Sequence, residues 1–332
     1  MRLKTLHGVN LGGWLIVEKW MTPSLFNGSD AIDEFTLSQT TAGRKAIKNH
    51  HKTFIQESDF QWLKDNGIDI IRVPVGYWLF ESEDNLIPHV HYVDWVMNMA
   101  EKYNIEVLID LHGLKGSQNG RDHSGKSGVA EWFKVEAYRT QSIDVLEKIA
   151  YRYATHPKFW GLQIINEPFP KLFNLKLRAY YKNAADRLSG ILKHTRIVFS
   201  DSFTPRLMSG VLPHINGKPA VMDIHVYQPF RPWIKFVPLD FFFDWLNWQK
   251  KLHQRLMKKQ SVIIGEWSGV IRHEDLMKVP EHKRDSLTKD YITQQLAVYS
   301  ASDAWFYWSY KTEGPGTWNY RSLVENGMIS NK

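Results

Sequence analysis

Short apolar runs rich in Val and Ile recur along the chain, and each is followed by a polar loop and an amphipathic stretch. These runs predict strands at Leu6–Val9, Ile68–Val73, Glu106–Leu111, Gly161–Ile165, Ile197–Phe199, Val221–His225, Val262–Gly265 and Ala304–Tyr307. Their continuous apolar character is typical of parallel strands that are buried on both faces. Because eight such strands alternate with helical patterns, we predict an α/β fold, a closed (β/α)8 barrel of the TIM type. A doubly wound open sheet is the alternative that this alternation leaves open.

The stretches between the strands carry helical periodicity over Phe60–Asn66, Tyr92–Tyr103, Glu131–Tyr153, Leu175–Leu192, Phe241–Lys258 and Leu287–Ser300. Ser58-Asp59 is a candidate cap for the first of these helices, which Gly67 would end. Residues 10–57 are too many for an ordinary connection, so we expect an extended insert between the first strand and the first barrel helix. We expect this insert to contain a helix around Thr41–Phe54 and to cover one end of the barrel. Barrels of this type reach 332 residues as one unit, and we expect residues 1–332 to form a single domain.

Composition argues against several classes of protein. The net charge is +7, but Lys and Arg are spread along the chain without a basic stripe, which disfavours a nucleic-acid partner. Without Cys there is no disulfide, no thiolate metal site and no cysteine nucleophile. No run of about 18 apolar residues occurs, so no transmembrane helix is predicted. The first residues lack the apolar core of a secretion leader, from which we expect a cytoplasmic protein unless a leader was removed.

Polar and aromatic residues gather at the ends of the predicted strands. They are Arg72, Asp110, His112, Asn166, Glu167, His225, Tyr227, Glu266 and Trp308. In a parallel barrel these positions share the rim where active sites lie. A random distribution would scatter such residues among helices and loops, so their convergence predicts a functional site at this rim.

Glu167 and Glu266 follow the fourth and seventh predicted strands, which lie nearly opposite in the ring. Cleavage of a glycosidic bond needs one carboxylic acid that protonates the leaving oxygen and one carboxylate on the other side of the anomeric carbon. A separation of about 5–5.5 Å gives retention through a covalent intermediate, and about 6.5–9.5 Å gives inversion. The structural alternative is that each Glu pairs with a cation such as Arg72. The presence of two such Glu residues and Asn166 on one rim argues against a purely structural ion pair.

The neighbouring residues also have structural interpretations. Arg72 can be a plain ion-pair partner, or it can keep Glu266 ionised by a charge-assisted hydrogen bond. His112 and His225 lack companions at metal-ligand spacing, so we predict no metal and expect them to bind sugar hydroxyls or a catalytic carboxylate. Trp308 can stack on a sugar or pack in the core.

Gly120–Ser127 has the spacing of a phosphate-binding P-loop. A working P-loop leaves a strand directly and opens a helix, whereas here the strand ends at Leu111 and Gly128-Val129 delays the next helix. We attribute the match to chance and expect no nucleotide cofactor. His50-His51 fits the exposed face of a helix, and no role is predicted for it.

Longer motifs carry a more specific signal. They are Gly8-Val9-Asn10-Leu11-Gly12-Gly13-Trp14-Leu15, Asp33-Glu34-Phe35-Thr36-Leu37, Ile71-Arg72-Val73-Pro74-Val75-Gly76-Tyr77-Trp78, Asp110-Leu111-His112-Gly113, Gly116-Ser117-Gln118-Asn119-Gly120, Asn166-Glu167-Pro168, His225-Val226-Tyr227-Gln228 and Trp308-Ser309-Tyr310-Lys311-Thr312-Glu313. Through these motifs, from about His7 to Ile329, the chain resembles glycoside hydrolase family 5, and within it the exo-β-1,3-glucanases best known from fungi.

The resemblance implies that Glu167 is the acid/base and Glu266 the nucleophile of a retaining mechanism with a covalent glucosyl-enzyme. It also implies that the sugar is surrounded by Glu18, Arg72, His112, Asn166, His225, Tyr227 and Trp308. Glu18 would bind hydroxyls at the closed end of the pocket and so make the enzyme exo-acting. The single domain would then be catalytic, and its chemistry requires no cofactor.

Three features depart from the family pattern. Arg121 stands where the fungal enzymes have the first of two Phe residues that clamp the next sugar, while Phe230 keeps the second. Because a guanidinium can stack on a ring and also donates hydrogen bonds, the leaving-group preference is open. Ser38 replaces a Cys of the fungal pattern, and no secretion leader is visible. Both favour an intracellular enzyme that acts on imported oligosaccharides or glucosides.

We therefore expect hydrolysis of terminal non-reducing β-D-glucosyl residues, with short β-1,3-glucans preferred to simple β-glucosides. The alternatives are a broad β-glucosidase for aryl, lipid or plant aglycones, a transglycosylase, or a carbohydrate-binding protein on an inactive barrel. The oligosaccharide or β-glucoside substrate is the only partner predicted, and a monomer is favoured. We also predict a raised pKa for Glu167, since an acid catalyst has to be protonated near neutral pH.

Overall fold

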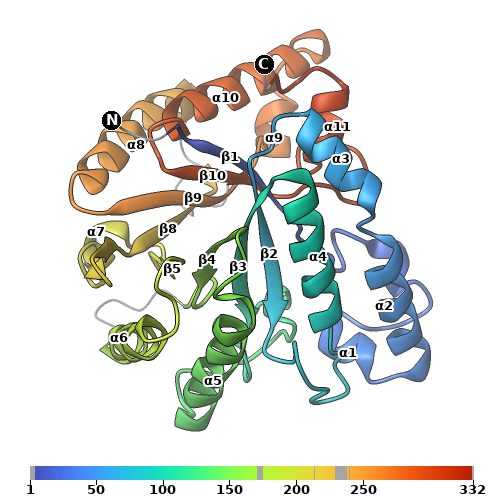
Figure 1. Cartoon of the computed structure of the whole chain (residues 1–332). Coiled ribbons are helices and arrows are strands. Elements are labelled where there is room, and N and C mark those ends of the chain that lie inside the picture. The colour runs from blue at the N-terminus through green and yellow to red at the C-terminus, as the bar shows by residue number, and fades with distance from the viewer. Residues whose placement is uncertain (1–3, 170–174, 213, 229–237, 239, 331–332) are drawn as a thin grey trace.

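The computed structural model describes residues 4–169, 175–212, 214–228, 238 and 240–330. Parallel strands close into an eight-membered barrel, in the order β1-β2-β3-β4-β5-β8-β9-β10 around the ring (Figure 1). They are β1 (Leu6–Asn10), β2 (Ile70–Gly76), β3 (Glu106–Gly113), β4 (Phe159–Gln163), β5 (Arg196–Ser200), β8 (Val221–Val226), β9 (Ser261–Trp267) and β10 (Ala304–Tyr307). Each of the eight predicted strands is present, and the predicted (β/α)8 barrel is confirmed over the open sheet.

Helices surround the strands in Figure 1. The helical elements are η1 (Pro23–Phe26), α1 (Glu34–Ser38), α2 (Thr41–Thr53), α3 (Glu57–Asp65), α4 (Val90–Tyr103), η2 (Asp122–Ser124), α5 (Glu136–Tyr153), α6 (Leu175–Ser189), α7 (Pro205–Met208), α8 (Asp240–Met257), α9 (His273–Leu276), α10 (Glu281–Tyr299) and α11 (Tyr320–Glu325). A short antiparallel pair, β6 (His214–Ile215) and β7 (Lys218–Pro219), lies outside the barrel sheet. Over the described ranges, none of these helices combines the length and apolarity that crossing a bilayer requires.

The outward faces of the strands pack against the helices. Val73 and Val75 of β2 share the main core with Leu63 of α3 and Val96 of α4. The helices present such residues every three or four positions, which turns one apolar stripe towards the sheet. Complete burial of a side chain of this kind contributes about 1.5–3 kcal/mol, so this layer is the main source of the barrel's stability.

The interior of the barrel changes from apolar to polar along the strands. A buried apolar layer consists of Ile70, Leu108, Trp160, Val198, Val221, Ile263, Ala304 and Phe306. Arg72, Asp110 and Asp223 each follow a residue of this layer by two positions, namely Ile70, Leu108 and Val221. Residues two apart on a strand share one face, so the charged layer lies on the apolar layer, towards the carboxyl ends of the strands. This alternation places buried charges where the rim loops begin.

Two strand boundaries differ from the predicted ones in a way that matters for the site. β2 continues to Gly76, so Arg72 lies inside the barrel rather than at a strand end. The regular pairing of β4 ends at Gln163, so Glu167 lies on the loop that follows and not at the strand end itself. Apolar periodicity marks where a strand is, but the pairing of its neighbours decides where it stops.

Helix starts also differ. Gln56 precedes α3, and Asp59 accepts a hydrogen bond of 2.8 Å from the Gln56 backbone N–H, so the predicted Ser58-Asp59 cap is wrong. α5 begins five residues later than predicted, because the Glu131 N–H bonds to Gly116 O at 2.7 Å in a preceding turn. α10 begins earlier than predicted, directly after Pro280.

The insert after β1 forms a small unit of its own at the carboxyl end of the barrel. α2 occupies nearly the predicted range, and the Thr40 side chain caps it by accepting from the Gly43 N–H. Ile47 of α2 packs with Val17 and Phe26 in a separate apolar cluster. The insert thereby holds its first loop rigidly beside the barrel mouth.

His50 and His51 are buried, so the sequence-based interpretation of an exposed pair is wrong. They follow Ile47 at the helical spacing of three and four residues, which places all three on the buried face of α2. The His51 ring packs edge-on against His89 and Tyr92, and within the described ranges neither ring nitrogen has a hydrogen-bond partner. Burial lowers the pKa of His50 and of His89 to about 4, and it lowers the pKa of His51 well below the ordinary value.

These histidines are expected to make the fold sensitive to acid. Below about pH 6.5 the unfolded chain binds protons that the folded chain cannot, so each such histidine lowers the free energy of unfolding by about 1.4 kcal/mol per pH unit. Glu18 and Glu34 oppose this trend, since burial raises the pKa of each to about 8. Their contribution to the free energy of unfolding is therefore largest at low pH and falls as the pH rises above about 4.5. A difference between variants therefore isolates the histidine contribution.

Urea unfolding of the His51→Leu variant at pH 7.5 and pH 5.5 measures this contribution. Between the two pH values the variant should lose about 1 kcal/mol less free energy of unfolding than the wild type. His282→Leu, at an exposed position of α10, is the matched control and should follow the wild type. Equal losses in the His51 variant and the wild type would contradict the prediction.

Candidate active site

Arg72 is the centre of the charged layer inside the barrel. Its side chain is fully buried, and its Nη2 lies 3.0 Å from Asp110 Oδ2. The other bonds are from Nη1 to Glu266 Oε1 (3.0 Å) and Asn10 Oδ1 (2.8 Å), from Nη2 to Asn166 Oδ1 (2.8 Å), and from Nε to Gln163 Oε1 (3.0 Å). A buried guanidinium is tolerated only with such complete pairing. The predicted bond between Arg72 and Glu266 is present.

Glu266 belongs to β9 and points into the barrel mouth. Arg72 holds its Oε1, and the Tyr227 hydroxyl donates to its Oε2 at 3.0 Å. His225 Nδ1 lies 3.4 Å from the same Oε2. These contacts hold both oxygens of the side chain in place at the barrel mouth.

Glu167 approaches from the opposite side of the mouth. Its backbone has φ 38°, a left-handed conformation that costs about 1 kcal/mol or more for a residue with a Cβ. The side chain is held on both oxygens: His225 Nδ1 lies 2.8 Å from Oε1, and His123 Nε2 lies 3.2 Å from Oε2. Arg121 Nη1 lies 4.0 Å from Oε2 on the exposed side.

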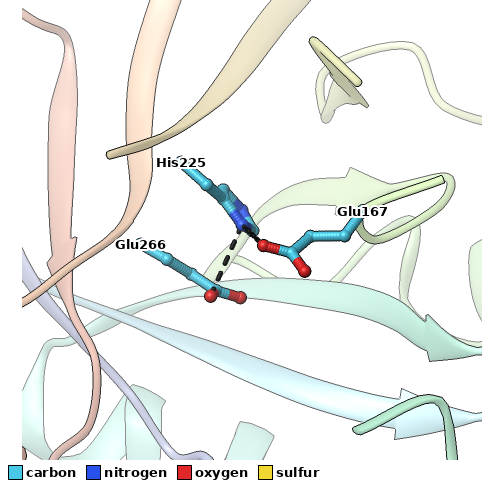
Figure 2. Close-up of side chains that lie close together, drawn as sticks. All are labelled: Glu167, His225 and Glu266. Carbon is cyan, nitrogen blue, oxygen red and sulfur yellow. Dashed lines mark hydrogen bonds and ion pairs between the residues drawn. The ribbon is translucent and has the colours of Figure 1, made fainter. Parts of the chain in front are cut away.

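The two carboxyl groups face each other across a short gap, with His225 beside both (Figure 2). One oxygen of Glu167, one oxygen of Glu266 and one nitrogen of His225 all lie within 4.8 Å of one another. This value limits the approach of the two nearest carboxyl oxygens, and it is compatible with the spacing of about 5–5.5 Å between the carboxyl groups of retaining glycosidases. Within the described residues, these three side chains are also the group whose atoms could meet on one cation.

Asp223 supports His225 from beneath. Asp223 Oδ2 lies 3.0 Å from His225 Nε2, while His225 Nδ1 faces the two glutamates. Burial lowers the pKa of His225, but Glu266, Asp223 and Glu167 outweigh burial and raise it well above the ordinary value. His225 is therefore a cation held between three carboxylates.

The prediction of a raised pKa for Glu167 is wrong. Burial raises the pKa of this carboxyl group, but the hydrogen bonds and positive charges of His123 and His225 outweigh burial and hold the pKa well below the ordinary value. The prediction followed from the need for a protonated acid in the reaction, and the sequence did not indicate that His123 lies beside Glu167.

His112 and Trp308 form one wall of the mouth. Their rings stack with centroids 5.6 Å apart and planes inclined by 10°. His112 Nδ1 lies 2.6 Å from Asp110 Oδ2, and Asn166 Nδ2 lies 3.2 Å from His112 Nε2. A neutral ring that donates from Nδ1 and accepts at Nε2 satisfies both contacts, in line with a pKa that burial lowers. Trp308 is only 4% exposed, yet it borders the pocket, so it serves both as packing and as a pocket wall.

A pocket of about 650 Å³ opens above the two glutamates. Eight of the predicted site residues border it, namely Glu18, His112, Arg121, Glu167, His225, Tyr227, Glu266 and Trp308. Arg72 and Asn166 lie beneath them, hydrogen-bonded to each other. Phe230 lies outside the described residues. The lining residues that were not predicted are Trp20, Asp122, His123, Phe203 and Trp318.

The insert supplies one end of the pocket. Glu18 is 4% exposed, and its Oε2 accepts a bond of 2.8 Å from Trp20 Nε1. Trp20 meets Trp318 edge-on at 5.2 Å, so two indoles from distant parts of the chain adjoin Glu18. Burial raises the pKa of Glu18 to about 8, which permits a neutral carboxyl group here at neutral pH.

The loop that resembles a P-loop contributes to the pocket. No helix opens at Lys126-Ser127, since α5 begins at Glu136, so the rejection of a P-loop agrees with the structure. The same loop nevertheless forms η2 and carries His123 to Glu167. His123 does not follow a strand, and the motif that contains it is the rejected P-loop spacing, which is why the strand-end criterion missed it.

A closed (β/α)8 barrel with two carboxyl groups facing each other beside a rim pocket is the arrangement of a glycoside hydrolase. The Cellulase family, glycosyl hydrolase family 5, matches residues 32–314. The chain belongs to glycosyl hydrolase family 5, as its motifs predicted.

Individual relatives agree with this assignment. A probable glucan 1,3-beta-glucosidase of Arthroderma benhamiae is 31% identical over 377 residues, which cover 98% of this chain and 89% of that protein. The glucan 1,3-beta-glucosidase of Kluyveromyces lactis is 30% identical over 382 residues, covering 98% and 88%. The crystal structure of rutinosidase from Aspergillus niger has the same fold, with a TM-score of 0.83, 22% identity and 98% of both chains covered.

Proposed function

We propose that the protein is a retaining, exo-acting β-glucosidase that removes terminal non-reducing β-D-glucosyl residues, with short β-1,3-glucans as preferred substrates. The short gap between the carboxyl groups of Glu167 and Glu266 carries the proposal, because nearest oxygens within 4.8 Å of each other are expected for two carboxyl groups that act on one anomeric carbon with retention. The names of the relatives from Arthroderma benhamiae and Kluyveromyces lactis support the β-1,3 preference.

In the proposed reaction Glu266 attacks the anomeric carbon while Glu167 protonates the leaving oxygen. Arg72 and Tyr227 hold the Glu266 carboxylate in place and stabilise its charge before attack. The resulting glucosyl ester is then hydrolysed by a water that Glu167 deprotonates. We further propose that Asn166, His112 and Trp308 bind and orient the sugar in the same pocket.

Glu18 and Trp20 support exo action. They border the pocket beside the insert, and Glu18 presents a buried carboxyl group to any sugar that enters. A terminal glucose can bond this group through its hydroxyls, whereas a chain that continued past it would have to displace the insert. The products should therefore be released one glucose at a time.

Arg121 favours a second candidate, a broader β-glucosidase for glycosides with non-sugar aglycones. Its side chain is 66% exposed and lies next to Glu167, on the side where the leaving group would be. Phe203 also borders the pocket. An aromatic ring and an exposed guanidinium accept a wider range of leaving groups than two clamping Phe rings. Retaining chemistry also permits transfer of glucose to a second sugar.

Hydrolysis rates on laminaribiose, cellobiose and an aryl β-glucoside distinguish the candidates. The β-1,3 proposal expects the highest kcat/KM on laminaribiose and glucose as the only product from longer laminari-oligosaccharides. Equal kcat/KM on the three substrates would contradict the β-1,3 preference. Oligosaccharide fragments larger than glucose among the first products would contradict exo action.

We propose that residues 1–332 act as one catalytic domain, supported by a family match at 32–314 that covers every barrel strand except β1. We also propose that the protein acts as a monomer in the cytoplasm on a carbohydrate substrate.

A further inference from the structure

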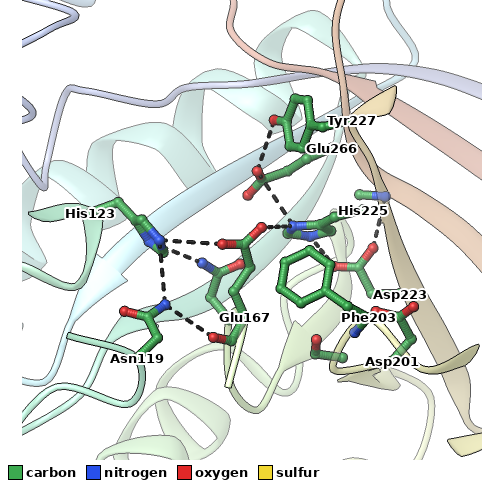
Figure 3. Close-up of polar contacts among 12 residues, drawn as sticks. Asn119, His123, Glu167, Asp201, Phe203, Asp223, His225, Tyr227 and Glu266 are labelled. Atoms are coloured by element: carbon green, nitrogen blue, oxygen red, sulfur yellow. Dashed lines mark hydrogen bonds and ion pairs between the residues drawn. The ribbon is translucent and has the colours of Figure 1, made fainter. Parts of the chain in front are cut away.

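Two histidines hold the carboxyl group of Glu167, one on each oxygen (Figure 3). His225 belongs to β8 and lies between Glu167 and Glu266. His123 comes from η2, reaches Oε2 from the other side, and its side chain is 14% exposed towards the pocket. Asn119 fixes this loop to Glu167, since its Nδ2 donates to the Glu167 backbone oxygen at 3.0 Å. The position of His123 next to the acid/base is therefore built into the loop.

The two histidines differ in how firmly their positive charge is held. His225 has three carboxylates within 3.4 Å, from Glu167, Asp223 and Glu266, so loss of its proton would weaken its contacts with all three. His123 has one: over the described part of the chain, only the carboxylate of Glu167 lies within 4.0 Å of it. The proton of His123 is consequently the one that can move to Glu167 at the lower cost.

The surroundings of His123 favour its protonated form. Burial lowers its pKa, but the hydrogen bond and charge of Glu167 outweigh burial, with help from Glu18 and Glu266, and the pKa is raised. Other charged or titratable groups that face the ring are His112 and Asp110 of β3 and, on its own loop, Arg121 and Asp122. The neutral His112 ring lies 5.2 Å away and adds no charge of its own.

We propose that His123 is a positioning residue that stores the proton of Glu167. The proposal rests on the function proposed above and specifies where the acid proton resides before the reaction. Before cleavage the proton moves from His123 Nε2 to Glu167 Oε2, which leaves a neutral imidazole and a carboxylic acid. His123 acts only through Glu167 and touches neither the anomeric carbon nor the leaving oxygen.

The proton balance closes over the two steps. Glu167 gives its proton to the glycosidic oxygen as that oxygen leaves C1 with the bonding electron pair, while an oxygen of Glu266 forms the new bond to C1. In the second step the oxygen of water bonds to C1, the ester electron pair returns to Glu266, and Glu167 takes the proton from water. Return of that proton to His123 Nε2 restores the resting enzyme.

The variant His123→Asn tests the proposal, because an amide can still donate to Oε2 but cannot store a proton. The measurement is kcat/KM against pH, which reports groups of the free enzyme, on laminaribiose and on 2,4-dinitrophenyl β-glucoside. On laminaribiose we expect a loss of at least about tenfold at neutral pH. The alkaline limb should also move to lower pH by about one unit, since the proton must then reside on the carboxyl group alone. The dinitrophenyl substrate leaves without protonation and should show a smaller loss.

Controls separate this role from a structural one. His282→Asn, at an exposed position of α10, should retain the wild-type pH profile. An unchanged alkaline limb in His123→Asn, or equal losses on both substrates, would overturn the proposal. If the melting temperature shows that this variant does not fold, His123→Gln provides the same comparison. Failure of the wild type to hydrolyse either glucoside would instead overturn the proposed function itself.

Discussion

Replacement of Glu266 by Gln is expected to lower kcat by at least about 10,000-fold on every glucoside, because no other group can form the covalent intermediate. The amide cannot attack the anomeric carbon, yet it fills the same volume and can still bond Arg72 and Tyr227. Binding of a glucoside should therefore persist, and the melting temperature should stay near the wild-type value. Steady-state rates, isothermal titration and thermal unfolding measure the three quantities.

Glu274→Gln is the matched control, since this residue is exposed on α9 outside the pocket. It should retain wild-type turnover. Glu266→Ala with added azide provides an independent readout, because azide in the vacated space should attack from the same face as Glu266 and release α-glucosyl azide. Wild-type turnover in Glu266→Gln would remove Glu266 from the mechanism.

Replacement of Glu167 by Ala is expected to have an effect that depends on the leaving group. On laminaribiose, which needs protonation, kcat/KM should fall by about 100- to 10,000-fold, the contribution of a positioned acid. On 2,4-dinitrophenyl β-glucoside the first step should survive, but the glucosyl-enzyme should accumulate because the base of the second step is absent. Intact-protein mass spectrometry detects the accumulated intermediate.

Azide should again identify the missing group. In Glu167→Ala it attacks the glucosyl-enzyme from the opposite face, so the product should be β-glucosyl azide, in contrast to the α-product of Glu266→Ala. Equal losses of kcat/KM on both substrates would show that Glu167 is not the acid. Formation of the same azide anomer by both variants would contradict their assignment to opposite faces of the sugar.

The barrel was predictable because its strands are buried on both faces and are written as continuous apolar runs such as Val262–Ile264. The layers inside it were not predicted. Arg72 follows Ile70 by two residues, and only the parallel pairing of β2 with its neighbours shows that both point inward. Helix starts such as that of α5 depend on a backbone bond to Gly116, a contact between distant residues that local periodicity does not contain.

The site shows the same division. Glu167, His225 and Glu266 were predictable because they lie at or just after strand ends, and the carboxyl ends of parallel strands meet. His123 was missed because it lies in the short helical turn η2, which follows no strand and brings it to Glu167. Together with His225, it reverses the direction of the predicted pKa shift of Glu167. Electrostatic predictions therefore failed where the sequence does not specify which loop residue faces the site.

The burial of His51 illustrates a third limit. Spacing places it on one face of α2, but the sequence does not reveal that the insert folds this face against Tyr92 and His89. Two adjacent histidines are more often solvated, since buried imidazoles without partners are costly. Here the rings fill space under the insert that carries Glu18.

The anomer of glucose first released from laminaritriose tests the central claim most directly, namely that Glu167 and Glu266 act across one anomeric carbon with retention. Proton NMR, recorded before mutarotation equilibrates the anomers, distinguishes them. The short gap between the two carboxyl groups predicts β-glucose as the initial product. Initial release of α-glucose would show inversion and would contradict the covalent mechanism together with the role of Glu266 as nucleophile.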